Sequence, residues 1–164
     1  DYTEVCVTVS SSSTIDVRRA TYTVPSQLQN EVLRIRLYHD RLECYLGSKQ
    51  VCKLTRVYPT GKTTRARQIN YRHIIHSLVK KPQAFRYSKL RDDLLPTAVY
   101  RQIWNTVNNN MNAKIACKFI VGLLHLAATE DCEHALGEAV VQHIMQNKLS
   151  LLKFYRLQII LMKA

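Results

Sequence analysis

Apolar and polar residues alternate along LRIRL (33–37) and again along LECYL (42–46). Between these runs, His39 and Asp40 supply a polar turn. A period of two places all the apolar side chains of a strand on one face of a sheet. This segment therefore predicts an antiparallel hairpin with one buried face and one face lined by arginine and tyrosine.

Shorter stretches of the first sixty residues show the same period. Valines at positions 5, 7 and 9 share one face, residues 14–24 (TIDVRRATYTV) are expected to form a second strand that ends before Pro25, and residues 50–58 (QVCKLTRVY) follow a turn at Gly47-Ser48. Several short strands joined by short polar turns favour a small antiparallel β-barrel, because closure removes the exposed edges of an open sheet.

From Ile69 onward the spacing of the apolar residues becomes helical. A stripe runs along the first helix, which Pro82 ends: Tyr71, Ile74, Ile75, Leu78 and Val79. Further elements are expected at 90–95, from Thr97 to Val107, at 115–128, at 131–147, and after a capping Ser150, with a break at Asn108–Asn110. We therefore expect an α+β fold with a small antiparallel β-barrel at 1–58, a basic linker at 59–69 and a helical carboxy-terminal subdomain at 70–164.

Positive charge is concentrated in the middle of the chain. The formal net charge is +12, from 24 basic and 12 acidic side chains, and no acidic residue occurs between Glu43 and Asp92. A small domain with this much charge attracts polyanions such as nucleic acid. Because 46% of the residues are hydrophobic, the chain is also able to bury a core and is not a disordered basic tail.

The five cysteines are odd in number and form no C-x-x-C motif, which predicts reduced thiols and a cytoplasmic location. The most apolar stretch, residues 151–162 (LLKFYRLQIILM), is interrupted by Lys153, Arg156 and Gln158 and is too short to span a membrane. Because the chain starts on a strand-like stretch without methionine, we expect a fragment of a longer, soluble protein.

The candidate catalytic groups form no convincing active site. His73 and His76 have a spacing that a metal could use, but a third ligand is absent nearby and their basic neighbours repel cations. Asp92 and Asp93 are adjacent, so on a helix they point in different directions. Gly61-Lys62-Thr63 resembles the end of a phosphate-binding loop, yet the glycine that should come five residues before Gly61 is replaced by Arg56.

Basic and aromatic side chains therefore define the candidate site, a surface for a nucleic-acid backbone with tyrosines available for stacking. The predicted DNA-binding residues come from the strands, the linker and the first helices: Arg34, Arg36, Arg41, Lys62, Arg65, Arg67, Arg72, His73, His76, Lys80, Lys81 and Arg86. Since no recognition-helix pattern occurs, we expect little sequence preference. An acidic protein partner is the alternative ligand for such a surface.

Several segments resemble a known family. ATYTVPS (20–26) and LRIRLYHDRLECYLG (33–47) are similar to the small β-barrel that follows the catalytic domain of insertion-sequence transposases. NYRHIIHSLVKKPQAF (70–85), RDDLLPT (91–97) and LLHLAA (123–128) resemble the IstA-type transposase, which works with an AAA+ ATPase helper. The resemblance extends from about Ala20 to about Gln146.

This resemblance implies a non-catalytic carboxy-terminal region that binds DNA and assembles transposase protomers and the ATPase. The Asp-Asp-Glu triad and its divalent metal would lie upstream, so we expect no cofactor in this chain. Two other interpretations remain open. The chain could chiefly be a protein-interaction module whose apolar end docks on a protomer or the ATPase, or a small metalloenzyme that uses His73 and His76.

Overall fold

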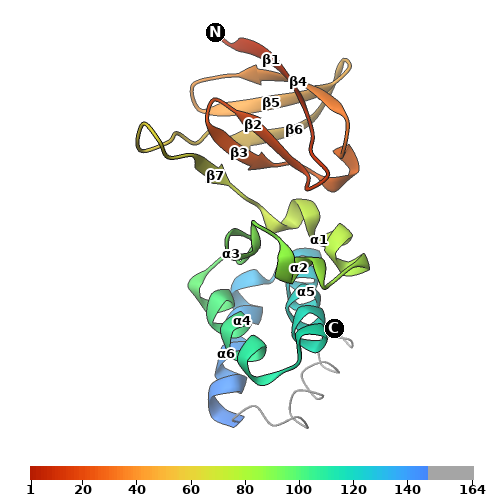
Figure 1. The fold of residues 1–164 in the computed structure, drawn as a ribbon, viewed down its shortest axis with the longest axis vertical. Helices are drawn as coiled ribbons and strands as arrows, with labels where there is room; N and C mark the ends of the chain where they lie inside the picture. Colours follow the sequence, from red (N-terminus) through yellow and green to blue (C-terminus); the bar gives the residue numbers. More distant parts are fainter. Residues whose placement is uncertain (148–164) are drawn as a thin grey trace. The chain divides into compact units, whose positions relative to one another are not determined.

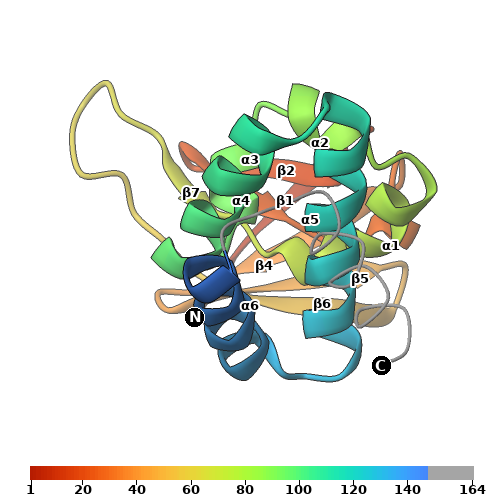
Figure 2. The same cartoon turned by 90° about the horizontal axis from the view of Figure 1, so that it is seen from below.

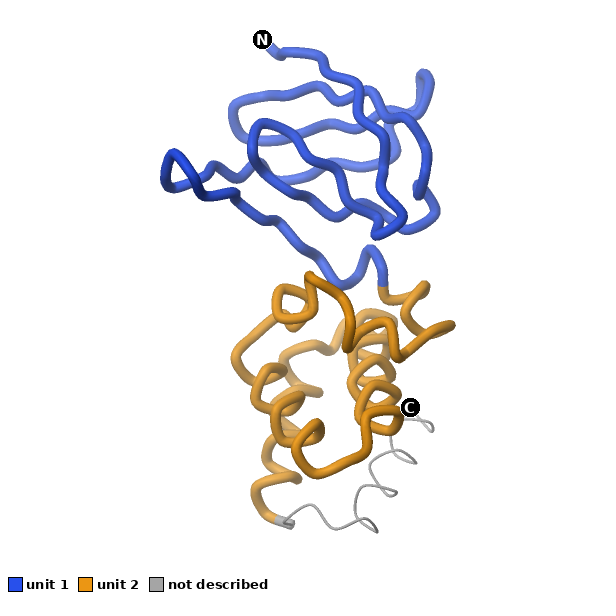
Figure 3. The backbone as a smooth tube through the Cα atoms, viewed as in Figure 1, with its two compact units in different colours: residues 1–74 blue, residues 75–164 orange. Residues whose placement is uncertain are grey.

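The structure, a computed structural model, describes residues 1–147 and confirms an α+β architecture with strands first and helices after them (Figure 1). The chain divides into two compact units, residues 1–74 and residues 75–164 (Figure 3). Within the described residues, no helix combines the length and apolarity needed to cross a bilayer.

Four strands of the first unit form an antiparallel sheet in the order β1-β4-β5-β6. Their bounds are β1 Thr3–Thr8, β4 Val32–Leu37, β5 Arg41–Leu46 and β6 Lys49–Thr55. In the central pair, Ile35 lies opposite Cys44, and Leu37 lies opposite Leu42, all of them buried. The alternation of the sequence thus correctly predicted the hairpin and its buried face.

A second sheet has three strands in the order β2-β3-β7. Their bounds are β2 Thr14–Val17, β3 Ala20–Thr23 and β7 Ala66–Gln68. The single strand expected over 14–24 is wrong, because Arg18 and Arg19 turn the chain with φ values of 49° and 60°. Strand β7, from the expected linker, pairs in parallel with β3.

The expected barrel is also wrong, because no β-ladder among the described residues joins the two sheets. Alternation determines which face of a strand is buried, but it does not determine which edges pair. Both sheets instead bury their apolar faces in one core that includes Ile15, Tyr22 and Leu33. A side-chain hydrogen bond connects β3 to the segment after β6, because the Val57 N–H donates to the Tyr22 hydroxyl at 3.1 Å.

A short 3-10 helix, η1, covers Ser26–Leu28 in the first unit. The α-helices are α1 Tyr71–Lys80, α2 Ala84–Tyr87, α3 Arg91–Leu94, α4 Ala98–Asn110, α5 Ala113–Thr129 and α6 Glu133–Asn147. Helix α1 crosses the boundary between the units, and it ends before Pro82 as expected.

In the second unit, α4 packs against α5 and α6 (Figure 2). The break expected at Asn108–Asn110 is wrong, since α4 continues through it and α5 begins after Asn112, whose side chain accepts a hydrogen bond from Ile115 N–H at 2.9 Å. Val79 was expected on the buried stripe of α1 but is 41% exposed. The helix expected after Ser150 and the apolar end Leu149–Met162 lie outside the described residues.

Candidate nucleic-acid interface

Three of the predicted DNA-binding arginines stand on the outward face of the four-stranded sheet, where they alternate with tyrosines. The Arg36 guanidinium lies 4.8 Å from the ring centre of Tyr2 and 4.7 Å from that of Tyr45. Arg34 lies 5.3 Å from the Tyr45 ring centre, and Arg41 lies 3.9 Å from the Tyr38 ring centre. These six residues, which lie on β4 and β5, just before β1 and just after β4, form an Arg–Tyr ladder held by cation–π contacts.

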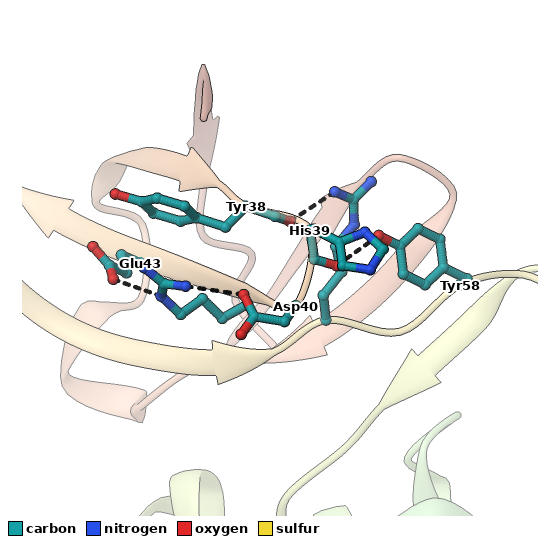
Figure 4. A network of polar contacts seen from close by, with 7 residues as sticks. Tyr38, His39, Asp40, Glu43 and Tyr58 are labelled. Atoms are coloured by element: carbon teal, nitrogen blue, oxygen red, sulfur yellow. Dashed lines mark hydrogen bonds and ion pairs between the residues drawn. The ribbon is translucent and has the colours of Figure 1, made fainter. Parts of the chain in front are cut away.

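Carboxylates neutralise much of the Arg–Tyr ladder. Arg34 Nη1 lies 3.2 Å from Glu4 Oε1 on the neighbouring strand. Arg41 contacts Glu43 at 2.8 Å and Asp40 at 2.9 Å, and its hydrogen bonds lower the pKa of both carboxyl groups (Figure 4). The arginines of the Arg–Tyr ladder therefore make contacts within the sheet. These contacts reduce the number of N–H donors and the net positive charge available to a phosphate backbone.

Arg56 and Tyr58 hold the turn between β4 and β5, beside the Arg–Tyr ladder, by hydrogen bonds. Arg56 Nη1 donates to the Tyr38 carbonyl at 2.8 Å, and the Tyr58 hydroxyl donates to the His39 carbonyl at 2.6 Å (Figure 4). The Arg56 guanidinium also stands 4.5 Å from the Tyr58 ring centre. These contacts fix the β4–β5 turn to the segment that follows β6.

A second cluster of cations lies where the β2–β3 turn meets the loop between β6 and β7. This basic tip consists of Arg18, Arg19, Lys62, Arg65 and Arg67, all exposed. Arg19 Nη2 donates to the backbone carbonyls of Gly61 and Thr64, the latter at 2.9 Å, so it holds the loop against the turn. Figure 1 shows this loop extending from the sheets of the first unit.

Asp16 places a carboxylate beside the basic tip. Asp16 contacts Arg65 at 2.8 Å and also accepts the Thr21 hydroxyl at 2.6 Å. Arg67 lies on β7, opposite Thr21 in the parallel pair. The five exposed cations of the basic tip form an arrangement suited to several phosphate groups of a nucleic-acid backbone.

The two histidines of α1 face different neighbours. His73, expected on the exposed basic side, is half-buried, with its Nδ1 3.0 Å from the Thr23 hydroxyl, and burial lowers its pKa. His76 is exposed and packs edge-on against His125 of α5, with 5.5 Å between ring centres. Within residues 1–147, no group of three or more His, Cys, Asp or Glu side chains could hold a metal ion.

The remaining predicted contacts are divided between surface and interior. Arg72, Lys80 and Lys81 are exposed, on α1 and just after its end. Arg86 is half-buried, where it hydrogen-bonds Asn108 and lies 5.4 Å from the Trp104 ring centre. Arg86 therefore contributes to packing within the second unit.

Sequence reasoning missed Arg18 and Arg19 as parts of the site, although a signal was present. Ile15 and Val17 are apolar at odd positions, whereas Ala20 and Tyr22 are apolar at even positions. Two inserted residues with left-handed backbone explain that change of phase, since they make a tight hairpin turn. The turn places two cations at the end of the sheet.

Residues 2–66 match the family model of the Mu transposase C-terminal domain, which supports a transposase C-terminal region for this part of the chain. An uncharacterized protein of Sinorhizobium fredii, y4jA/y4nE/y4sE, is 38% identical over 151 residues. That alignment covers 91% of this chain and 30% of the relative, so the chain spans less than a third of the relative's length. No solved structure matches the chain.

Proposed function

We propose that this chain is a non-catalytic DNA-binding and assembly region of a DNA transposase, acting in the transposition, recombination and integration of an insertion sequence. The basic tip is the observation that carries the proposal, because its five cations lie within or beside the 2–66 segment that matches the transposase family model. Backbone contacts of this kind bind duplex DNA with little sequence preference.

The finer assignment rests on the motifs of the helical half. In this assignment, the full-length protein is an IstA-type transposase of a mobile element and is located in the cytoplasm. Its partners are other transposase protomers and an AAA+ ATPase. Catalysis is assigned to an Asp-Asp-Glu domain and its divalent metal outside this chain. The coding sequence immediately upstream of Asp1 tests this assignment: it should encode the end of an Asp-Asp-Glu domain, and any other domain there would refute it.

DNA binding is tested by the dependence of affinity on salt. If the basic tip neutralises four or five phosphates, the affinity for a duplex should fall roughly 100- to 500-fold between about 50 and 200 mM salt. Fluorescence anisotropy with two unrelated duplexes measures both this slope and the sequence preference. Weak binding that does not change with salt would refute the proposal.

A matched pair of variants assigns the contacts to the basic tip. Arg18→Gln, Lys62→Gln and Arg67→Gln together remove three cations but leave Arg19, which holds the loop. The salt slope should then decrease by about 2.7, from three contacts at about 0.9 each. The control carries Arg101→Gln, Lys114→Gln and Lys118→Gln, which remove three exposed cations of α4 and α5. An equal loss in both variants would mean that overall charge, and not the tip, determines binding.

The assembly role is supported by apolar side chains that the helical half leaves on its surface. Val79, Tyr87 and Met145 are 41%, 80% and 70% exposed. Light scattering of the full chain and of a version ending at Asn147 tests this role. Loss of self-association in a folded shortened chain would favour a docking function for the apolar end, whereas unfolding would show that this end completes the chain's own core.

A further inference from the structure

Two of the five cysteines lie directly opposite each other in the four-stranded sheet. Cys44 of β5 and Cys52 of β6 are register partners in an antiparallel pair. Cys44 is fully buried in the core of the first unit, and Cys52 is half-buried against the same core. Both side chains therefore point to the inner face of the sheet.

The separation of such partners fits a disulfide. Directly opposed residues of an antiparallel pair have Cα atoms about 4.5 or about 5.5 Å apart, depending on the type of pair. Disulfides connect Cα atoms that are about 4.4 to 6.8 Å apart. The neighbouring partners Leu42 and Leu54 are both buried. The side chains of these two pairs between β5 and β6 therefore lie on the same face of the sheet. A bond between the two sulfurs thus requires no change of register.

The two thiols are close enough to influence each other's pKa. A side-chain contact with Cys52, together with burial, raises the pKa of Cys44, and the same contact lowers the pKa of Cys52. Thiolates are the nucleophilic form of cysteine. Cys52 also belongs to β6, the outer strand of the sheet, so it is the more accessible of the two.

We propose that Cys44 and Cys52 form a redox modification site, a cross-strand dithiol that hydrogen peroxide converts into an intramolecular disulfide. The Cys52 thiolate attacks one peroxide oxygen, the O–O bond breaks, and Cys52 becomes a sulfenic acid as the other oxygen leaves as water after taking up a proton. The Cys44 sulfur then attacks the Cys52 sulfur, and the sulfenic oxygen leaves as a second water. Two thiols and one peroxide give one disulfide and two waters, with two electrons transferred.

The other cysteines lack such a partner. Cys6 is exposed on β1 opposite Arg34, Cys117 is buried in α5, and the Cys132 thiol lies 3.9 Å from the Leu126 carbonyl. Cys44 and Cys52 are the pair of cysteines that strand register joins among the described residues. The site is independent of DNA binding, because neither residue belongs to the basic tip.

The bond would fasten the outer strand at an irregular point. A register shift follows immediately after this pair, where Tyr45 lies opposite Gln50 and Val51 is the extra residue. Bulges locally disrupt the ladder. A disulfide here would hold β6 against β5 beside the bulge, and a dithiol reductant would release it.

Peptide mapping after treatment of the full chain with hydrogen peroxide tests the proposal. We expect a peptide pair linked through Cys44 and Cys52, the loss of two hydrogens from the intact mass, and reversal by dithiothreitol. In the matched variants, Cys6→Ser should retain the linked peptides and Cys52→Ser should lose them.

Three results would overturn the proposal: Cys44 and Cys52 both remaining alkylatable after Cys6 has been oxidised, sulfinic acid at Cys52 without a link, or a link that joins other cysteines. The wild-type map decides between these results even if Cys52→Ser fails to fold. A melting curve of each variant reports that failure separately.

Discussion

Thr23 is fully buried, and its hydroxyl forms hydrogen bonds with two polar groups at the start of α1. It accepts the Asn70 N–H at 2.8 Å and lies 3.0 Å from His73 Nδ1. Thr23→Val keeps the shape of the side chain but leaves both groups without this partner, so we expect a loss of about 1–3 kcal/mol in the free energy of unfolding. Urea denaturation measures it. Thr55→Val, at an exposed strand position, is the control and should change stability by less than about 0.5 kcal/mol.

His73 gives the same region a dependence on pH. Burial lowers its pKa in the folded chain, whereas an unfolded histidine titrates near about 6.5. The unfolded state therefore binds the proton more readily than the folded state. As the pH falls below about 6.5, protonation of His73 favours the unfolded state and the free energy of unfolding decreases. In urea denaturation between about pH 8 and 5, the wild type should lose more stability than His73→Gln. His134→Gln, at an exposed position of α6, controls for the replacement of a histidine by glutamine.

At the scale of elements, α4 and α6 approach closely at Gly137. A Cβ at this position would lie 2.9 Å from Tyr100 Cε2 and 3.2 Å from Val99 Cγ1. The Tyr100 ring cannot easily move away, because it is buried and its hydroxyl donates to the Glu133 carbonyl at 2.5 Å. Gly137→Ala should therefore destabilise the helical unit by about 1–3 kcal/mol.

Gly122 provides the matched comparison for Gly137. It lies inside α5, and among residues 1–147 a Cβ there would meet nothing within 4 Å. Because alanine restricts the unfolded chain and favours a helix, Gly122→Ala should stabilise the protein by about 0.5–1 kcal/mol. Thermal melts of the two variants should therefore shift in opposite directions. A destabilised Gly122→Ala would contradict the open space seen around this glycine.

The elements that the sequence predicts well are those whose periodic pattern is long enough to be specific. Residues 33–38 and 41–46 each show three positions of either phase, and they form β4 and β5 with the expected buried side, except that Leu46 is exposed. Strand β7 has three residues, too few for any period, and its partner β3 lies more than forty residues away. Its pairing depends on tertiary contacts that no local pattern encodes, which is also why the edges of a barrel were predicted wrongly.

The candidate site shows the same division between local and non-local information. Alternation placed Arg34 and Arg36 on the outward face of the sheet, as found. It could not show that register brings Glu4 beside Arg34 or the Tyr2 ring beside Arg36. The arginines of the Arg–Tyr ladder are therefore mostly paired, while the basic tip contains Arg18 and Arg19 from a turn that was expected to be strand.

For the whole molecule, DNA binding depends on how the positive charge is divided between the basic tip and the exposed cations of α1 and the residue after it. Twelve cations lie between Glu43 and Asp92, a segment that extends over both units. The basic tip belongs to the first unit, and Lys80 and Lys81 belong to the second. Each surface that contacts a duplex adds its own released counterions to the salt dependence of binding.

Charge reversal on α1 tests whether both surfaces contact DNA. Arg72→Glu, Lys80→Glu and Lys81→Glu together should weaken duplex binding and reduce the salt slope by about 2.7 or more, without loss of helix by circular dichroism. If the two sets of cations contact separate phosphates, their effects on the logarithm of affinity should add when the variants are combined. Reversal at Arg101, Lys114 and Lys118 controls for net charge. If affinity stays unchanged while the helix remains intact, α1 has no part in the interface and the basic tip alone accounts for binding.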